Sequence, residues 1–142
     1  MTNTQNLLNE ICKTCEMGHN TLLQLTTTSE NESFCQSMRI QLKAYDIILN
    51  EAIVMLEQHE LAVPKLNELA RMGTFLNIKI STLANKSTRH IADMLLQGTN
   101  MGIIEMVKAK KDCPNAEKNV ISLTDRLINM QERNIEELKA FL

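Results

Sequence analysis

Glu16 and His19 form the one Glu-x-x-His motif of this 142-residue chain. Three positions apart on a helix, the two side chains share one face. In a four-helix bundle such a motif belongs to a di-iron site, which needs a second copy on another helix and roughly four inward carboxylates. A later segment of similar pattern carries Asn100 and Ile103 at the equivalent positions. Because neither completes the ligand set, we expect no metal at Glu16 and His19, and a di-iron site is the alternative hypothesis.

Cys12 and Cys15 form a Cys-x-x-Cys pair, a spacing found at redox and zinc sites. Those sites place the pair in a turn or at the start of a helix, where the thiol pKa falls. Here the pair lies well inside a predicted helix, on its apolar side. A zinc site with His19 lacks a fourth ligand. We therefore expect both thiols to pack in the core as small apolar groups, with all four cysteines of the chain reduced.

The other residues that could do chemistry are assigned to packing and helix capping. Tyr45, the single tyrosine, lies on an apolar stripe, where we expect it to pack with its hydroxyl bonded to a neighbour. Lys108, Lys110 and Lys111 fall in the last turn of a predicted helix, where cations complement the helix dipole. No glycine-rich phosphate loop follows a strand, and no nucleophile is aligned with a base. The sequence therefore predicts no catalytic residue and no cofactor.

The composition indicates one domain over residues 1–142, with 44% hydrophobic residues and a net charge of −2. The basic surplus that nonspecific nucleic-acid binding requires is missing. No apolar stretch approaches the roughly 20 residues of a membrane span. The first residues lack the basic patch and the apolar run of a signal peptide. We therefore expect a cytoplasmic protein that binds neither nucleic acid nor membrane.

The elements that position these residues are helices, because apolar residues recur with a helical period throughout the chain. Two Met-Gly pairs, at 17–18 and 101–102, stand in the middle of two long helical segments. Each segment leads through a short polar break into another. A helical hairpin that is used twice buries its apolar stripes by closing into a four-helix bundle. The expected helices, with approximate bounds, cover 3–28, 30–59, a short crossover piece at 65–83, 88–111, and the stretch from the Pro114 turn to the C-terminus.

Several polar residues and prolines predict where these helices begin. Ser29 and Glu32 match the capping box that opens a helix. Ser87 is suited to cap the helix that follows it. Pro114 is suited to the first position of the last helix.

The positions that face the core follow from the same period. They are, in chain order, Leu8, Ile11, Cys15, Gly18, Leu22, Leu25, Phe34, Met38, Leu42, Tyr45, Leu49, Ala52, Leu56, Ile91, Met94, Leu95, Gly98, Gly102, Met106, Ala109, Val120, Leu123, Leu127, Met130, Asn134, Leu138 and Phe141. Asn134 interrupts its stripe, and we expect it to hydrogen-bond inside the bundle. Gly18, Gly98 and Gly102 weaken a helix, so we expect them to allow close packing; a ligand in the gap they leave is the alternative.

Three short segments carry a resemblance to a known family. Segments 8–11 (LNEI) and 15–18 (CEMG) resemble the opening of small bacterial ferritin-like four-helix proteins of unassigned function. Segment 73–79 (GTFLNIK) is similar to the G-x-x-x-N-L-K stretch before the third helix of that family. The tryptophan and acidic residues that usually accompany these segments are absent here. The resemblance implies a ferritin-like fold and a bacterial source, and it implies no activity.

Two classes of function follow from these observations. The first is a non-enzymatic helical-bundle protein that acts by binding a protein partner or by self-association. The alternative is a ferritin-like metal-binding oxidase or iron-handling protein of the di-iron type, which would use Glu16 and His19. The sequence favours the first class, because the second half of the ligand set is missing.

Overall fold

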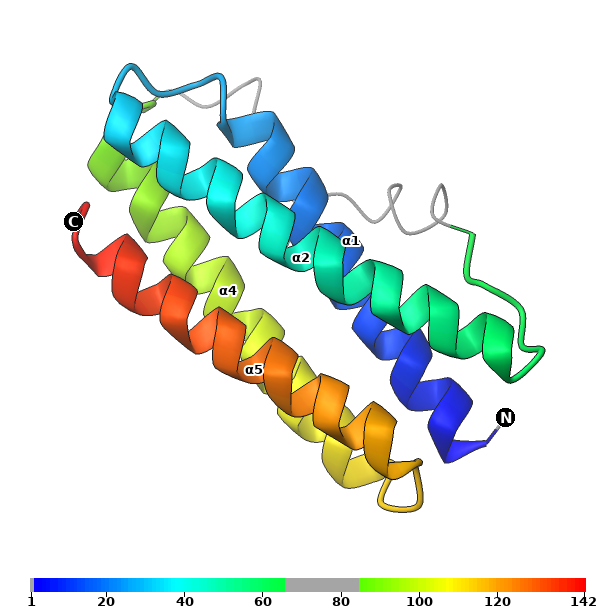
Figure 1. The fold of residues 1–142 in the computed structure, drawn as a ribbon. Coiled ribbons are helices and arrows are strands. Elements are labelled where there is room, and N and C mark those ends of the chain that lie inside the picture. The colour runs from blue at the N-terminus through cyan, green and yellow to red at the C-terminus, as the bar shows by residue number, and fades with distance from the viewer. Residues whose placement is uncertain (1, 66–84) are drawn as a thin grey trace.

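The computed structural model describes residues 2–65 and 85–142, which are all-helical with no strand among them (Figure 1). The helices are α1 (Asn3–Leu25), α2 (Glu32–Gln58), α4 (Thr88–Asp112) and α5 (Lys118–Lys139). The four long helices of the prediction are therefore confirmed, with small shifts at their ends. The short helix predicted at about 65–83 lies outside the described residues.

The four helices pack lengthwise as two antiparallel hairpins around a shared core (Figure 1). The most extensive contacts join α1 to α2 and α4 to α5, and smaller ones join α1 to α4 and α2 to α5. Helix α2 runs in the same direction as α4, so the end of α2 and the start of α4 lie at opposite ends of the assembly. The connection between the hairpins must therefore span the length of α2, which is about 40 Å at 1.5 Å per residue.

The core consists of the apolar stripes that the helical period predicts. Every stripe position expected on α1 is buried. On the other helices Leu42, Met94 and Phe141 are only partly buried, and the remaining expected positions are buried. Phe141 packs its ring 4.8 Å, centroid to centroid, from the ring of Phe34, which closes one end of the core. Each helix thus turns one apolar stripe inward.

The helix starts follow the capping rules, with one correction to the prediction. Ser87 caps α4 as expected, because its hydroxyl accepts a bond from the backbone N–H of His90. The capping box at Ser29 is wrong. Asn31 is the N-cap of α2, and its side chain accepts from the N–H of Phe34 at 3.0 Å. Ser29 instead accepts from the N–H of Asn31 and bonds to Thr88 at 3.1 Å, which joins the α1–α2 turn to the start of α4.

Two other ends are set by backbone geometry. Helix α2 ends at Gln58; just beyond it Glu60 has a left-handed φ of 54°, and the N–H of Leu61 bonds back to the carbonyl of Leu56. Pro114 lies in a turn as predicted, but it does not open the last helix, since α5 begins at Lys118. Among the described helices none is long and apolar enough to cross a membrane.

Candidate functional site

His19 and Glu16, the predicted metal candidates, lie at the junction of α1 and α2. The Nδ1 atom of His19 lies 2.7 Å from Oδ1 of Asp46 on α2, and both side chains are partly exposed. Burial raises the pKa of the Glu16 carboxyl, which His19 partly offsets and Asp46 reinforces. In the described part of the chain no three His, Cys, Asp or Glu side chains converge as a ligand group. His19 and Asp46 thus form a contact between α1 and α2.

Cys12 and Cys15 lie inside α1 with fully buried side chains, which confirms the prediction of core packing. Burial is the main cause that raises the pKa of the Cys12 thiol to about 12, and it raises that of Cys15 as well. Because the thiolate is the form that attacks disulfides and binds zinc, both reactions are disfavoured here. The expected reduced state of the cysteines stays a prediction.

The centre of the bundle holds a polar group around Tyr45, whose side chain is 1% exposed. The side-chain N–H of Gln131 donates to the Tyr45 hydroxyl at 3.4 Å, and the side chains of Asn134 and Thr99 also lie near that hydroxyl. Burial raises the pKa of Tyr45 far above its ordinary value, and these three polar neighbours only partly reverse the effect. The prediction for Tyr45 is confirmed, since the tyrosine is a buried packing residue whose hydroxyl accepts a hydrogen bond. Asn134 is buried beside it, and its expected hydrogen bond stays a prediction.

This group, which we call the polar layer, connects the two hairpins. Tyr45 belongs to the α1–α2 hairpin, whereas Thr99, Gln131 and Asn134 belong to the α4–α5 hairpin. A buried hydrogen bond forms only when both partners meet in the correct register. The polar layer therefore fixes how far one hairpin slides along the other.

Gly18 makes room for the polar layer on the α1 side. A Cβ atom at this position would lie 2.7 Å from Cε2 and Cζ of Tyr45, closer than non-bonded carbons approach. Gly18 is thus tightly packed, but the expectation that it lets two helix backbones approach is wrong, because the close neighbour is the aromatic ring of Tyr45. Gly98 and Gly102 are buried on α4.

Sequence reasoning missed the buried polar residues other than Asn134, among them Gln41, Thr99 and Gln131, which are all at most 3% exposed. A signal was present, because each lies on the apolar stripe of its helix. On α5, for example, Gln131 falls four residues after Leu127 and three before Asn134. A glutamine at a stripe position is thus a candidate buried residue.

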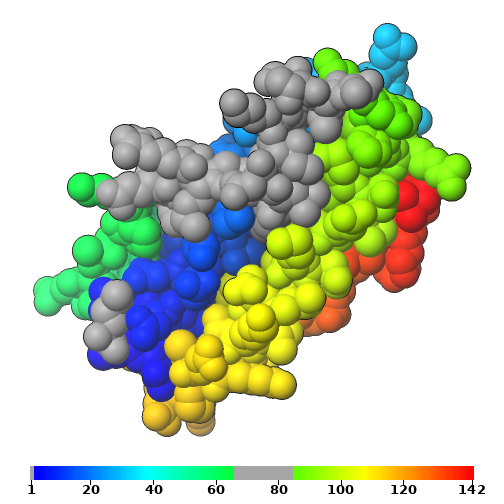
Figure 2. All heavy atoms as spheres, turned by 180° about the vertical axis from the view of Figure 1, so that it is seen from behind, coloured from blue at the N-terminus to red at the C-terminus, as the bar shows by residue number. Residues whose placement is uncertain are grey.

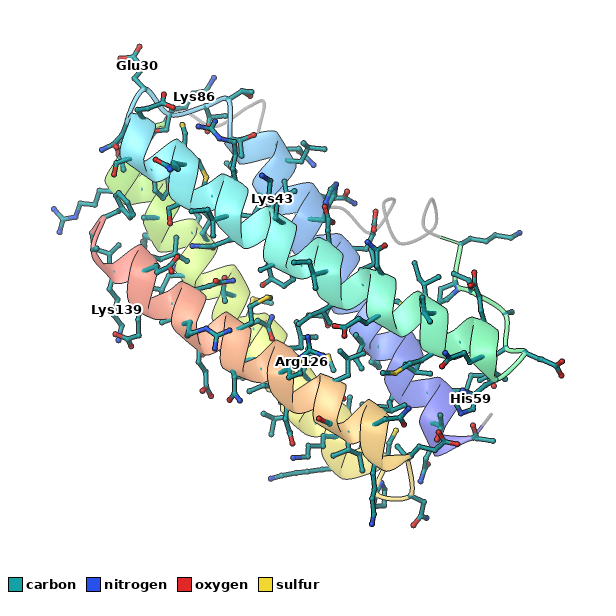
Figure 3. The ribbon with its side chains drawn as sticks, viewed as in Figure 1. Glu30, Lys43, His59, Lys86, Arg126 and Lys139 are labelled. Atoms are coloured by element: carbon teal, nitrogen blue, oxygen red, sulfur yellow. The ribbon has the colours of Figure 1, made fainter. Side chains whose placement is uncertain are left out.

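A row of apolar side chains faces outward on α2. Ile40, Ile47 and Val54 are 57%, 59% and 49% exposed, and they recur every seven residues. At 100° per residue they form a narrow line on the side opposite the core stripe. Figure 3 shows Lys43 on the side of this face toward α1, and Arg126 reaching from α5 toward α2. We call this surface the α2 face.

Three chain segments meet where α2 ends. Nδ1 of His59, which Figure 3 labels, lies 2.7 Å from the carbonyl oxygen of Met55. Nε2 of the same ring lies 2.8 Å from Oε2 of Glu117, the residue before α5. The backbone N–H of Glu117 donates to the hydroxyl of Thr4 at the start of α1. Both ring nitrogens of His59 thus face acceptors, which favours the charged imidazolium and raises the His59 pKa, Glu117 being the main cause.

Helices α1 and α4 lie side by side on the face seen in Figure 2. Between them a small hollow of about 160 Å³ lies over Gly102, with Met17 and Met101 among its walls. The charged residues at its rim, Glu10, Lys13 and Glu105, are of both signs. The hollow shows where the missing side chain of Gly102 leaves space, and its charges favour no one class of ligand.

Comparisons of the chain with protein-family models, with curated proteins and with solved structures gave no match. The resemblance to small bacterial ferritin-like proteins therefore stays a prediction.

Proposed function

We propose that this protein is a non-enzymatic helical bundle that acts by self-association through the α2 face. The observation that carries the proposal is the outward row of Ile40, Ile47 and Val54, each about half exposed. A row with heptad spacing on a helix surface is the pattern by which one helix packs on another. A second copy of the chain presents the same row and is the occupant that we propose.

The charges beside the row favour an antiparallel pair. On the side of the α2 face toward α1, Arg39 and Lys43 lie in the N-terminal half and Glu57 in the C-terminal half, and Arg39 also pairs with Glu32 at 3.0 Å. An antiparallel copy centred on Ile47 sets the Glu57 of one chain beside the Arg39 of the other. The row itself is symmetric about Ile47, because the other two apolar residues lie seven positions on either side. A two-fold axis through this point therefore matches the surface to itself.

The expected dimer is weak. Three half-exposed aliphatic side chains per copy contribute a small apolar area, well under the roughly 1,200 Å² of total burial that stable specific interfaces need. We therefore expect dimers that form and separate with concentration, in the range of tens to hundreds of micromolar as an order of magnitude.

Sedimentation over a wide concentration range tests this proposal. The parent chain should shift from monomer toward dimer, and Ile47→Glu should abolish the shift. Ile104→Glu is the matched control, since Ile104 is 45% exposed on α4 and away from the α2 face. A parent chain that stays monomeric, or a control that weakens the dimer as much as Ile47→Glu, contradicts self-association through this face. If the parent chain stays monomeric, a different protein that binds the parent chain but not Ile47→Glu would show that the α2 face binds a heterologous partner.

Charge reversal distinguishes the orientation. Glu57→Arg should weaken an antiparallel dimer, and adding Arg39→Glu should restore it, because the opposite charges are then exchanged and not lost. If neither change affects the association, the copies do not pair antiparallel along this side.

We further propose a ferritin-like arrangement without the metal chemistry of that fold class. Its support is the parallel course of α2 and α4, since one long crossover between two hairpins is the connection typical of ferritin-like bundles (Figure 1). Against a metal centre stand the pairing of His19 with Asp46 and the lack of inward carboxylates among the described core residues. Protein purified without chelators should carry no stoichiometric iron, manganese or zinc by elemental analysis. About two metal ions per chain, lost in Glu16→Ala or His19→Ala, would overturn this.

A further inference from the structure

Three buried amide side chains each have one atom without a hydrogen-bond partner, two in the polar layer and one, Gln41, next to it. The atoms are Nε2 of Gln41, Oε1 of Gln131 and Nδ2 of Asn134. The three residues are 2%, 0% and 5% exposed, in that order. A buried polar atom that lacks a partner has lost its hydrogen bonds to water without replacement, and folded proteins rarely leave several such atoms together. A missing group that binds all three would replace those hydrogen bonds.

The three atoms belong to one level of the bundle, between α2 and α5. Gln131 donates to the hydroxyl of Tyr45, and Asn134, one turn further along α5, lies near the same hydroxyl. Gln41 lies one turn before Tyr45 on the same side of α2. The bonds from Ser37 to Glu137 and from Gln131 to Tyr45 set the antiparallel register of the two helices, and this register places Gln41 level with Asn134.

Rotation of an amide group does not satisfy these atoms. If the amide of Gln131 turns over, its oxygen accepts from the Tyr45 hydroxyl and its nitrogen then lacks a partner. The missing bond moves to the other atom of the same side chain. The Gln131 amide has two ends, and Tyr45 satisfies one of them only.

We propose that the polar layer is a binding site for one small neutral hydrogen-bonding ligand, namely a water molecule held between α2 and α5. The water oxygen accepts from Nε2 of Gln41 and Nδ2 of Asn134, and one of its O–H groups donates to Oε1 of Gln131. Buried waters in proteins make about three hydrogen bonds of this kind. A cation is excluded by the two amide N–H donors and an anion by the carbonyl oxygen, whereas water provides both donors and acceptors.

The water makes the junction of the hairpins a three-part contact. Gln41 lies on the first hairpin and the two other amides on the second, so the water joins the same two bodies that Tyr45 joins directly. At Gln41 the two hairpins are therefore joined through water, and at Tyr45 they are joined by a direct hydrogen bond.

Oxygen-17 magnetic relaxation dispersion counts long-lived internal water in solution and tests the proposal. Gln41→Met keeps the length of the side chain and removes its polar atoms, and it should lower the long-lived water by about one molecule per chain. Gln131→Met and Asn134→Leu should have the same effect, which covers the case that one variant fails to fold. Gln36→Met is the matched control, because Gln36 is exposed on the same helix, and it should leave the count unchanged.

A crystal structure at about 1.5 Å resolution gives the second measurement. It should show one water within hydrogen-bond distance of all three amides, at about 2.7–3.2 Å. The proposal is wrong if the amides instead bond directly to one another. It is equally wrong if folded Gln41→Met, Gln131→Met and Asn134→Leu all keep the parent count of long-lived water.

Discussion

The ring of Tyr45 on α2 fills the space that Gly18 leaves on α1, where a Cβ would lie only 2.7 Å from the ring carbons. The ring is buried and its hydroxyl is bonded across the core, so it has no free direction in which to move. Gly18→Leu should therefore lower the free energy of unfolding by about 1–3 kcal/mol or more through overpacking. Chemical denaturation measures this change, and Lys111→Leu on the surface should stay within about 0.5 kcal/mol of the parent.

A double variant separates the ring contact from the helix itself. In a Tyr45→Leu background the close neighbour of position 18 is gone, so Gly18→Ala should recover up to about 1 kcal/mol of helix propensity. In the parent background the same change should destabilise the protein. If Gly18→Ala has the same effect in both backgrounds, the contact with Tyr45 does not explain the glycine.

The contact between His59 and Glu117 predicts a pH dependence of stability. Hydrogen bonds that the His59 ring donates to Glu117, the larger cause, and to the carbonyl of Met55 raise the pKa of His59 in the folded state above its ordinary value of 6.5. The folded protein therefore binds this proton more tightly than the unfolded chain does. The stabilisation is complete below the unfolded pKa and is lost as the pH rises through the raised folded pKa.

Denaturation of the parent and of His59→Gln across neutral pH checks this sign. The stability advantage of the parent should shrink between slightly acidic and slightly alkaline pH, and added salt should reduce it further, since the pair is partly exposed. Glu117→Gln should flatten the pH dependence in the same way. An advantage that grows as the pH rises would show that His59 is not bound as the cation.

The buried thiols of α1 should be unreactive in the folded protein. In the folded protein Cys12 and Cys15 should resist a thiol reagent at pH 8 and react once the chain is unfolded, because burial raises their pKa values and excludes the reagent. Replacing either cysteine with alanine should cost about 1–2 kcal/mol through lost packing. A Cys12–Cys15 disulfide found by mass spectrometry of native protein under reducing conditions would contradict this account.

The helices and most of the core could be predicted from the sequence because both follow from one periodic signal. Residues such as Leu22 and Leu127 recur at the helical spacing, and that spacing alone indicates which side is buried. Helix ends depend on choices between similar side chains. Ser29 and Asn31 are both good N-caps two residues apart, and the bond that occupies Ser29 in the structure is one to Thr88, far away in the sequence, while Asn31 caps α2.

The polar layer and the α2 face were harder to predict because they depend on the register between helices. Tyr45 and Asn134 were recognisable as polar groups on apolar stripes, but the partnership of Gln131 with Tyr45 requires the alignment of α2 with α5. The row that contains Ile47 has helical spacing too, like the core stripe. It is recognisable as a surface only once the opposite side of α2 is known to be buried.

The division of contacts between the helices also has a consequence for the order of folding. The most extensive contacts lie within each hairpin and close short loops, whereas the bond from Gln131 to Tyr45 joins residues far apart in the chain. Local contacts form early, because they need little loop closure, and the hairpins then dock. Interactions that form after the rate-limiting barrier act on the unfolding rate. The polar layer is thus expected to control the unfolding rate, and the contacts within each hairpin are expected to control the folding rate.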